Sequence, residues 1–196
     1  MSAAEQANSN QKLPTWDLSD LYAGIDDPAL DRDLNSAAAR AELFAKTFAG
    51  RLATLGNAEL AASIGEYEAL DELLSKVMSF SQLVYAADVS DSEIAQFYQT
   101  CHERVNAIST QLLFYSLELN RLEQAHLDGL LAEGEPLSRY APWLRDVRAL
   151  RAHQLSDELE TLLHEKAVAG RSAWVRLFDE TVASLRFPVG GAELTE

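Results

Sequence analysis

The sequence predicts an all-α protein whose main part is an antiparallel bundle of long helices. Three stretches, at about residues 28–49, 57–87 and 91–133, repeat apolar residues at alternating steps of three and four, which places them on one face of an α-helix. The link between the second and third stretches, near residues 88–90, is short and polar. These two helices are therefore expected to lie side by side and to run in opposite directions.

The first two long helices have recognisable ends. Asp27 can cap the first helix, with Pro28 at the first helical position, where a missing amide proton does no harm. Gly50 is expected to end it in the left-handed conformation. Asn57 is expected to cap the second helix, which runs to the polar link before residue 90.

The third predicted helix begins at the capping-box sequence Ser90-Asp91-Ser92-Glu93 and continues to about Glu133. Nine apolar residues at steps of four and three form a narrow stripe along it, as in a helix that packs against long neighbours. They are Ile94, Tyr98, Cys101, Val105, Ile108, Leu112, Tyr115, Leu119 and Leu122.

Shorter elements are expected after Gly134. Prolines punctuate this part of the chain, Ser156 can cap a helix with acidic residues in its first turn, and Gly170 interrupts the pattern. Residues 187–195 surround a Gly-Gly pair and indicate a short extended or hairpin-like tail. The predicted helices cover about 142–151, 156–169 and 172–185.

Composition narrows the classes of function. The 196 residues carry 16 basic and 31 acidic side chains, a net charge of −15, which disfavours nucleic acid and anionic membrane partners. Cys101 is the single cysteine, so no internal disulfide forms, and a cytoplasmic location is expected. Residues 1–12 match neither a signal nor a transit peptide and are expected to be a disordered tail before one helical domain at 13–196.

Two partial metal motifs occur on predicted helices. The segment from His164 begins like the zinc motif His-Glu-x-x-His, but Val168 stands where the second histidine is needed. Glu123 and His126 have the Glu-x-x-His spacing of di-iron bundles, of which the chain has one copy, and the apolar stripes lack the inward-facing ligands that such a bundle needs. Cys101 lies on the apolar stripe and is interpreted as a small buried hydrophobe. We therefore predict no catalytic, cofactor-binding or metal-binding residue.

Four arginines form the one concentrated basic cluster of this acidic chain. Such a cluster can bind a carboxylate of a peptide or of a neighbouring domain. The alternative, which we favour, is that the arginines neutralise nearby acidic side chains of the same bundle. The cluster consists of Arg139, Arg145, Arg148 and Arg151.

Several segments, in this order, resemble the N-terminal region of oligoendopeptidase F, in the thimet-oligopeptidase-like group of zinc metallopeptidases. The similarity extends over nearly all of the chain from Leu13 onward. The segments are Trp16-Asp17-Leu18-Ser19-Asp20-Leu21-Tyr22, Ser109-Thr110-Gln111-Leu112-Leu113-Phe114-Tyr115, Pro142-Trp143-Leu144, His153-Gln154-Leu155-Ser156-Asp157-Glu158-Leu159-Glu160 and Ser172-Ala173-Trp174-Val175-Arg176-Leu177-Phe178-Asp179-Glu180.

The resemblance implies a helical domain that precedes the catalytic region and walls a channel for short peptides. Zinc and its ligands are expected later in the full-length parent, so this chain is expected to be an inactive part of a larger zinc metalloendopeptidase. Its implied partners are the catalytic domain of the same polypeptide and short peptide substrates. The alternative is a stand-alone helical interaction module with an exposed apolar groove for a partner helix.

Overall fold

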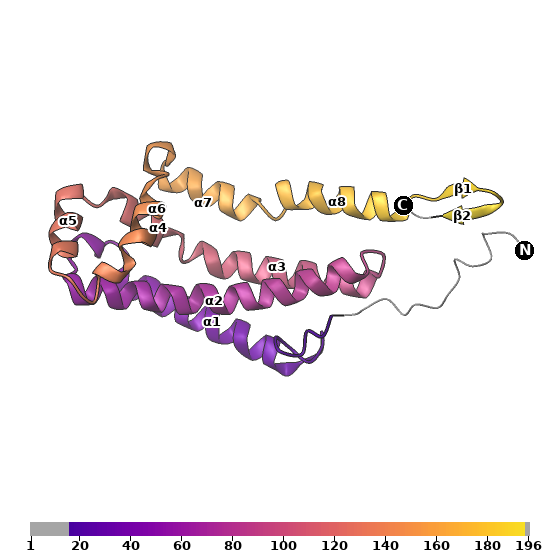
Figure 1. The fold of residues 1–196 in the computed structure, drawn as a ribbon, viewed down its shortest axis with the longest axis horizontal. Coiled ribbons are helices and arrows are strands. Elements are labelled where there is room, and N and C mark those ends of the chain that lie inside the picture. Colours follow the sequence, from indigo (N-terminus) through magenta and orange to yellow (C-terminus); the bar gives the residue numbers. More distant parts are fainter. Residues whose placement is uncertain (1–15, 195–196) are drawn as a thin grey trace, which may run out of the picture.

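The computed structural model describes residues 16–194, which are mainly helical (Figure 1). The tail predicted for residues 1–12 lies outside this range. No helix within 16–194 has both the length and the apolar character needed to cross a membrane. The elements are α1 (Pro28–Phe48), η2 (Leu52–Thr54), α2 (Asn57–Ala87), α3 (Ser92–Thr110), α4 (Leu113–Arg121), α5 (Gln124–Ala132), η3 (Ser138–Tyr140), α6 (Ala141–Arg148), η4 (Arg151–His153), α7 (Asp157–Lys166), α8 (Arg171–Ser184), β1 (Phe187–Val189) and β2 (Ala192–Leu194).

The long helices form the bundle that the sequence predicts. Helix α2 packs against both α1 and α3, and α3 returns alongside α2 after a short link (Figure 1). Helix α4 packs against α6, and α7 packs against α3. Helices α7 and α8 follow one another in a line above α3, and the antiparallel pair of β1 and β2 extends beyond the end of α8 (Figure 1). The all-α class and the C-terminal hairpin are thus confirmed.

The first described turn lies against the bundle through Tyr22. Tyr22 is 2% exposed, and its hydroxyl donates to Asp33 Oδ2 at 2.8 Å. The Tyr22 ring meets Phe80 edge-on at 5.2 Å, and Lys76 Nζ lies 4.2 Å from the centre of the ring on its face. This one aromatic residue therefore fixes the entering chain to both α1 and α2.

The ends of α1 follow the predicted chemistry, whereas the start of α2 does not. Asp27 Oδ1 accepts the Ala29 amide at 2.8 Å, and Gly50 has a φ of 75° just after the helix. The predicted Asn57 cap is wrong, because Gly56 is the N-cap and Glu59 accepts its amide at 3.2 Å. Asn57 is instead buried against the end of α5, where its side-chain amide donates to Leu130 O at 2.8 Å and to Gly134 O at 3.1 Å.

The predicted capping box at Ser90 is also wrong. Asp91 is the N-cap of α3, and its Oδ1 accepts the amides of Glu93 at 2.8 Å and Ile94 at 3.2 Å. The Ser90 hydroxyl donates to Asp88 Oδ1 at 2.6 Å. A carboxylate at this position is a stronger acceptor than a hydroxyl, and its charge is favourable at the positive end of the helix dipole.

The single long helix predicted over 91–133 is divided into α3, α4 and α5. At the first break the amides of Gln111 and Leu112 bond to carbonyls three residues back, each at 3.0 Å, which tightens the turn and redirects the axis. At the second break Leu122 has extended backbone angles, φ −52° and ψ 136°. The guanidinium of Arg148 binds the carbonyl oxygens of Leu119 and Leu122 and so stabilises the end of α4. A contact with α6 therefore fixes a break that the helical spacing does not show.

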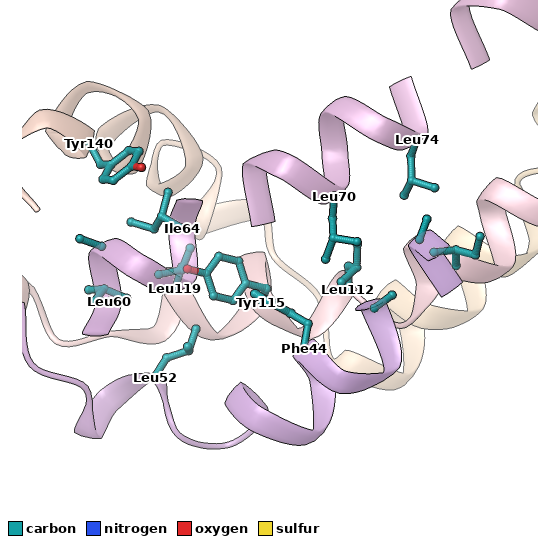
Figure 2. Close-up of a cluster of buried hydrophobic side chains, with 14 of the residues drawn as sticks. Phe44, Leu52, Leu60, Ile64, Leu70, Leu74, Leu112, Tyr115, Leu119 and Tyr140 are labelled. Carbon is teal, nitrogen blue, oxygen red and sulfur yellow. The ribbon is translucent and has the colours of Figure 1, made fainter. Parts of the chain in front are cut away.

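The core lies where α1, α2 and α4 meet, around the fully buried ring of Tyr115 (Figure 2). That ring stacks on Tyr67 at 4.9 Å and meets Phe44 edge-on at 5.0 Å. Its hydroxyl lies 2.7 Å from Ser63 Oγ, and Ser63 also donates to the Leu60 carbonyl at 2.8 Å. The hydroxyl of Tyr115 is therefore satisfied within the core.

Candidate functional site

The partial zinc motif in α7 is a packing contact between helices. His164 Nε2 lies 2.8 Å from Ser109 Oγ on α3, and Ser109 Oγ lies 3.1 Å from the Asn106 carbonyl oxygen. The arrangement that satisfies both contacts has Ser109 donating to the carbonyl and the imidazole donating to Ser109. Helix α7 ends at Lys166, so Val168 lies beyond the helix on which the zinc motif would require its second ligand.

The Glu-x-x-His match has no inward-facing partner. Glu123 is the N-cap residue of α5, and both Glu123 and His126 are exposed to solvent. Di-iron bundles use carboxylates and imidazoles that point into the core. Over residues 16–194, no three His, Cys, Asp or Glu side chains are grouped closely enough to hold a metal ion.

Cys101 lies in the core on α3 and is 4% exposed. Burial raises the pKa of its thiol to about 11, and the nearby Arg104 opposes this only in part. The side chain therefore stays protonated at neutral pH, as expected for a small hydrophobe rather than a nucleophile.

The arginine cluster has local roles. Arg145 forms an ion pair with Asp146 at 2.8 Å, as the neutralising interpretation predicts. Arg139 donates to the hydroxyl of Tyr140 and lies over its ring, 4.5 Å from the centre. Arg148 binds the end of α4 as described above and donates to Gln124 Oε1 at 3.1 Å. Arg139 and Arg148 thus bind neutral acceptors. The acidic residues near them in the sequence do not predict these contacts.

A cleft of about 890 Å³ lies between α8 and the end of the α2–α3 hairpin. In Figure 1, α8 lies above this end of the hairpin. The volume falls in the range of small-molecule and peptide sites, roughly 300–1,000 Å³. Its lining combines the last turns of α2, the link to α3, the middle of α3 and the length of α8.

Three parallel rings line the hairpin side of the cleft. The rings of Tyr85 and Tyr98 stack at 4.9 Å with 7° between their planes, and Tyr98 and His102 follow at 6.0 Å and 15°. Burial lowers the pKa of His102, the charge of Arg176 lowers it further and the carboxylate of Glu103 opposes this, so the neutral imidazole is favoured. The three rings form an aromatic wall, and Asp88 of the hairpin link also lines the cleft.

Tyr85 carries an unsatisfied polar atom at the cleft. The residue is 6% exposed, and its buried hydroxyl has no hydrogen-bond partner within the described part of the chain. Burial raises the pKa of Tyr85, and the carboxylates of Glu180 and Asp179 on α8 raise it further. The hydroxyl thus keeps its proton and lies close to the charged side chains of α8.

The cleft is richer in cations than the rest of the molecule. Arg171, Arg176 and Arg186 line it, against Asp88 and Asp179, whereas acidic residues outnumber basic ones 31 to 16 in the whole chain. Helical spacing alone could not find this site, because its two walls are about 80 residues apart in sequence. Arg171 and Arg176 on α8 and Arg186 just after it are widely spaced in sequence and give no local signal of the site.

Residues 155–194 form a C-terminal arm, made of α7, α8 and the hairpin, that has no buried residue. Many large apolar side chains face solvent along it, including Trp174 at 70% and Phe178 at 67% exposure. A group of exposed large apolar side chains on consecutive elements is typical of an interaction surface. The other members are Leu155, Leu159, Leu162, Leu163, Val175, Leu177, Leu185, Phe187, Val189 and Leu194.

Part of the chain matches a known family model. The family model for the N-terminal region of M3 peptidases, described as Oligopeptidase F, matches residues 118–187, from within α4 to the first residue of β1. No curated protein and no solved structure matches the chain. The matched segment contains α7 and α8, the helices that expose the apolar face of the arm. Residues 118–187, about a third of the chain, are therefore similar to the N-terminal region of oligopeptidase F.

Proposed function

We propose that this chain is the non-catalytic helical domain of a zinc metalloendopeptidase, and that it forms one wall of a channel that admits short peptides. The domain comprises residues 13–196, with residues 1–12 as a tail, and the enzyme works in the cytoplasm. The family match supports the N-terminal assignment, and the small number of cysteines fits the location. The wall selects substrates by size, while hydrolysis takes place in another region of the polypeptide.

The observation that carries the proposal is the exposed apolar face of the arm within the segment that matches the family. Two consecutive helices without a buried residue gain little stability from their own packing. A catalytic region docked on Trp174, Leu177 and Leu163, which do not line the cleft, would remove this surface from water at about 25 cal/mol per Å². The catalytic region of the same polypeptide is therefore the partner we assign to this face.

Zinc belongs to the catalytic region in this proposal. The described residues do not fit a zinc site, since the His164 imidazole is bound to Ser109 and no three His, Cys, Asp or Glu side chains over 16–194 are grouped to hold a metal. We therefore assign no step of the hydrolysis to residues of this chain.

The test compares this chain with a version extended along its own gene. Both are assayed on a quenched short peptide with added zinc and with a chelator. We expect chelator-sensitive cleavage by the extended chain and none by the 196-residue chain. Zinc-dependent cleavage by the short chain would overturn the assignment of a non-catalytic domain.

A stand-alone interaction module is the second candidate function, and the same exposed arm favours it. An amphipathic partner helix could occupy that face as well as a catalytic region could. Absence of cleavage by both chains, together with a stop codon after residue 196 in the gene, would favour this candidate.

A further inference from the structure

The cleft between α8 and the α2–α3 hairpin has the features of a built ligand site, and no part of the proposed channel function assigns it. It has an aromatic wall, an apolar wall and a group of guanidiniums. These features come from segments far apart in sequence, so the fold itself brings them together.

The apolar part is on α8. Val175, Phe178 and Val182 line the cleft and offer a surface for an apolar side chain, opposite the stacked rings of Tyr85 and Tyr98. Tyrosine rings suit such a wall because they present apolar faces and retain a polar tip.

The polar part is suited to a single carboxylate. Arg176 is already held in place, since it donates to Gln99 and lies 3.5 Å from Glu180 Oε1. A guanidinium has five N–H donors, so these contacts leave donors for an incoming anion. The protonated hydroxyl of Tyr85 adds a donor that has no partner in the described structure.

The charge balance disfavours a ligand with two negative charges. Three arginines and two carboxylates line the cleft, Arg176 is also paired with Glu180, and Asp88 is engaged by the amide of Ser90 at 3.1 Å. A phosphate group would bring about two negative charges and no apolar part to fill the rest of the cleft. A peptide end with a carboxylate and an apolar side chain matches both halves of the lining.

The geometry points to a subsite for the C-terminal residue of a short peptide. The terminal carboxylate binds Arg176 and accepts a hydrogen bond from Tyr85, and the last side chain lies between α8 and the stacked rings. This inference rests on the proposed function, because it takes short peptides as the substrates or products of the parent enzyme.

The test uses the 196-residue chain and two probes that differ at one group. N-acetyl-Leu-Phe with a free carboxylate and its C-terminal amide are titrated into the ¹⁵N-labelled chain and followed by NMR. We expect the acid to bind about tenfold more tightly than the amide, the ratio that one charged hydrogen bond provides. Shifts are expected at residues 85–102 and 171–186.

Variants then locate the carboxylate. Arg176→Gln is expected to remove the difference between acid and amide, and Tyr85→Phe to reduce it. Arg145→Gln is the control, because Arg145 is exposed and paired with Asp146 on α6. The spectrum of each free variant shows whether it is folded.

Equal affinity of the wild-type chain for acid and amide would overturn the inference without any variant, and so would shifts confined to other helices. Either result leaves the proposed function intact if the extended chain still shows chelator-sensitive cleavage. Loss of that cleavage would instead count against the function.

Discussion

Asn57 shows how a single side chain joins distant parts of the bundle. It lies at the start of α2, is 8% exposed, and binds two carbonyl oxygens at the end of α5. We expect Asn57→Ala to lower the free energy of unfolding by about 2 kcal/mol, because two buried acceptors lose their donor. Urea unfolding measures this change.

The control for Asn57 is Asn35→Ala on the exposed face of α1. Asn35 accepts one hydrogen bond from Arg104 at 3.1 Å, in contact with solvent. Its loss is expected to cost less than about 0.5 kcal/mol. Equal effects of the two substitutions would contradict the tertiary role of Asn57.

Cys101 makes stability depend on pH in the alkaline range. Its thiol pKa rises from 9.0 to about 11 on burial, so the folded chain holds this proton more tightly than the unfolded chain. The resulting stabilisation is fully present below about pH 9 and is lost as the pH rises through about 11.

We expect this thiol to account for about 2 to 3 kcal/mol of the stability lost over that range. Burial also raises the pKa values of Tyr22 and Tyr115. Their deprotonation at higher pH therefore also lowers the stability of the folded chain. The measurement is therefore the difference in slope between the wild-type chain and Cys101→Ala, from urea unfolding at a series of pH values. Identical slopes would contradict the burial of the thiol.

Helix caps show what the sequence can and cannot predict at single residues. Asp27 was predictable because a proline follows it at the first helical position, so the helix start could be placed directly after Asp27. Ser90 and Asn57 were predicted wrongly for two different reasons: Asp91 is a better acceptor one residue along, and the carbonyl oxygens of α5 are distant partners of Asn57. Local spacing cannot rank such competitors.

At the scale of elements, the spacing predicted burial better than it predicted helix continuity. Leu112, Tyr115, Leu119 and Leu122 are all 5% exposed or less, as expected from the apolar stripe, yet the helix breaks twice among them. The stripe reports which side chains face the core, whereas the breaks depend on tight turns and on Arg148 from α6. Tertiary contacts overrode a locally consistent helical pattern.

Gly170 sets the junction between α7 and α8. A Cβ added there would lie 2.8 Å from the Lys166 carbonyl oxygen, closer than real contacts allow. We expect Gly170→Ala to disturb the junction and to speed hydrogen exchange of the amides in the first turn of α8, because local opening becomes easier.

The matched control is Gly129→Ala, within α5, where an added Cβ meets nothing within 4 Å. Alanine is the better helix former there, so stability should rise by about 1 kcal/mol. A stabilising effect of Gly170→Ala would contradict the close approach at the junction.

At the scale of the whole molecule, the exposed arm sets this chain apart from a self-contained bundle. Residues 28–87 bury their apolar stripes, but α7, α8 and the hairpin leave theirs in solvent. The sequence predicted the helices of the arm and, through a family resemblance, the docking that would cover it. The sequence could not show the cleft between α8 and the α2–α3 hairpin, because no local pattern links these two distant segments.

The central claim is that this chain works as a docked part of a larger peptidase, with the apolar face of α7 and α8 covered. Hydrogen–deuterium exchange on the 196-residue chain and on the gene-extended chain tests it directly. We predict fast exchange in α7 and α8 of the short chain and strong protection in the extended chain, while the core amides of α2 are slow in both. Equally fast exchange of α7 and α8 in both chains would contradict the claim.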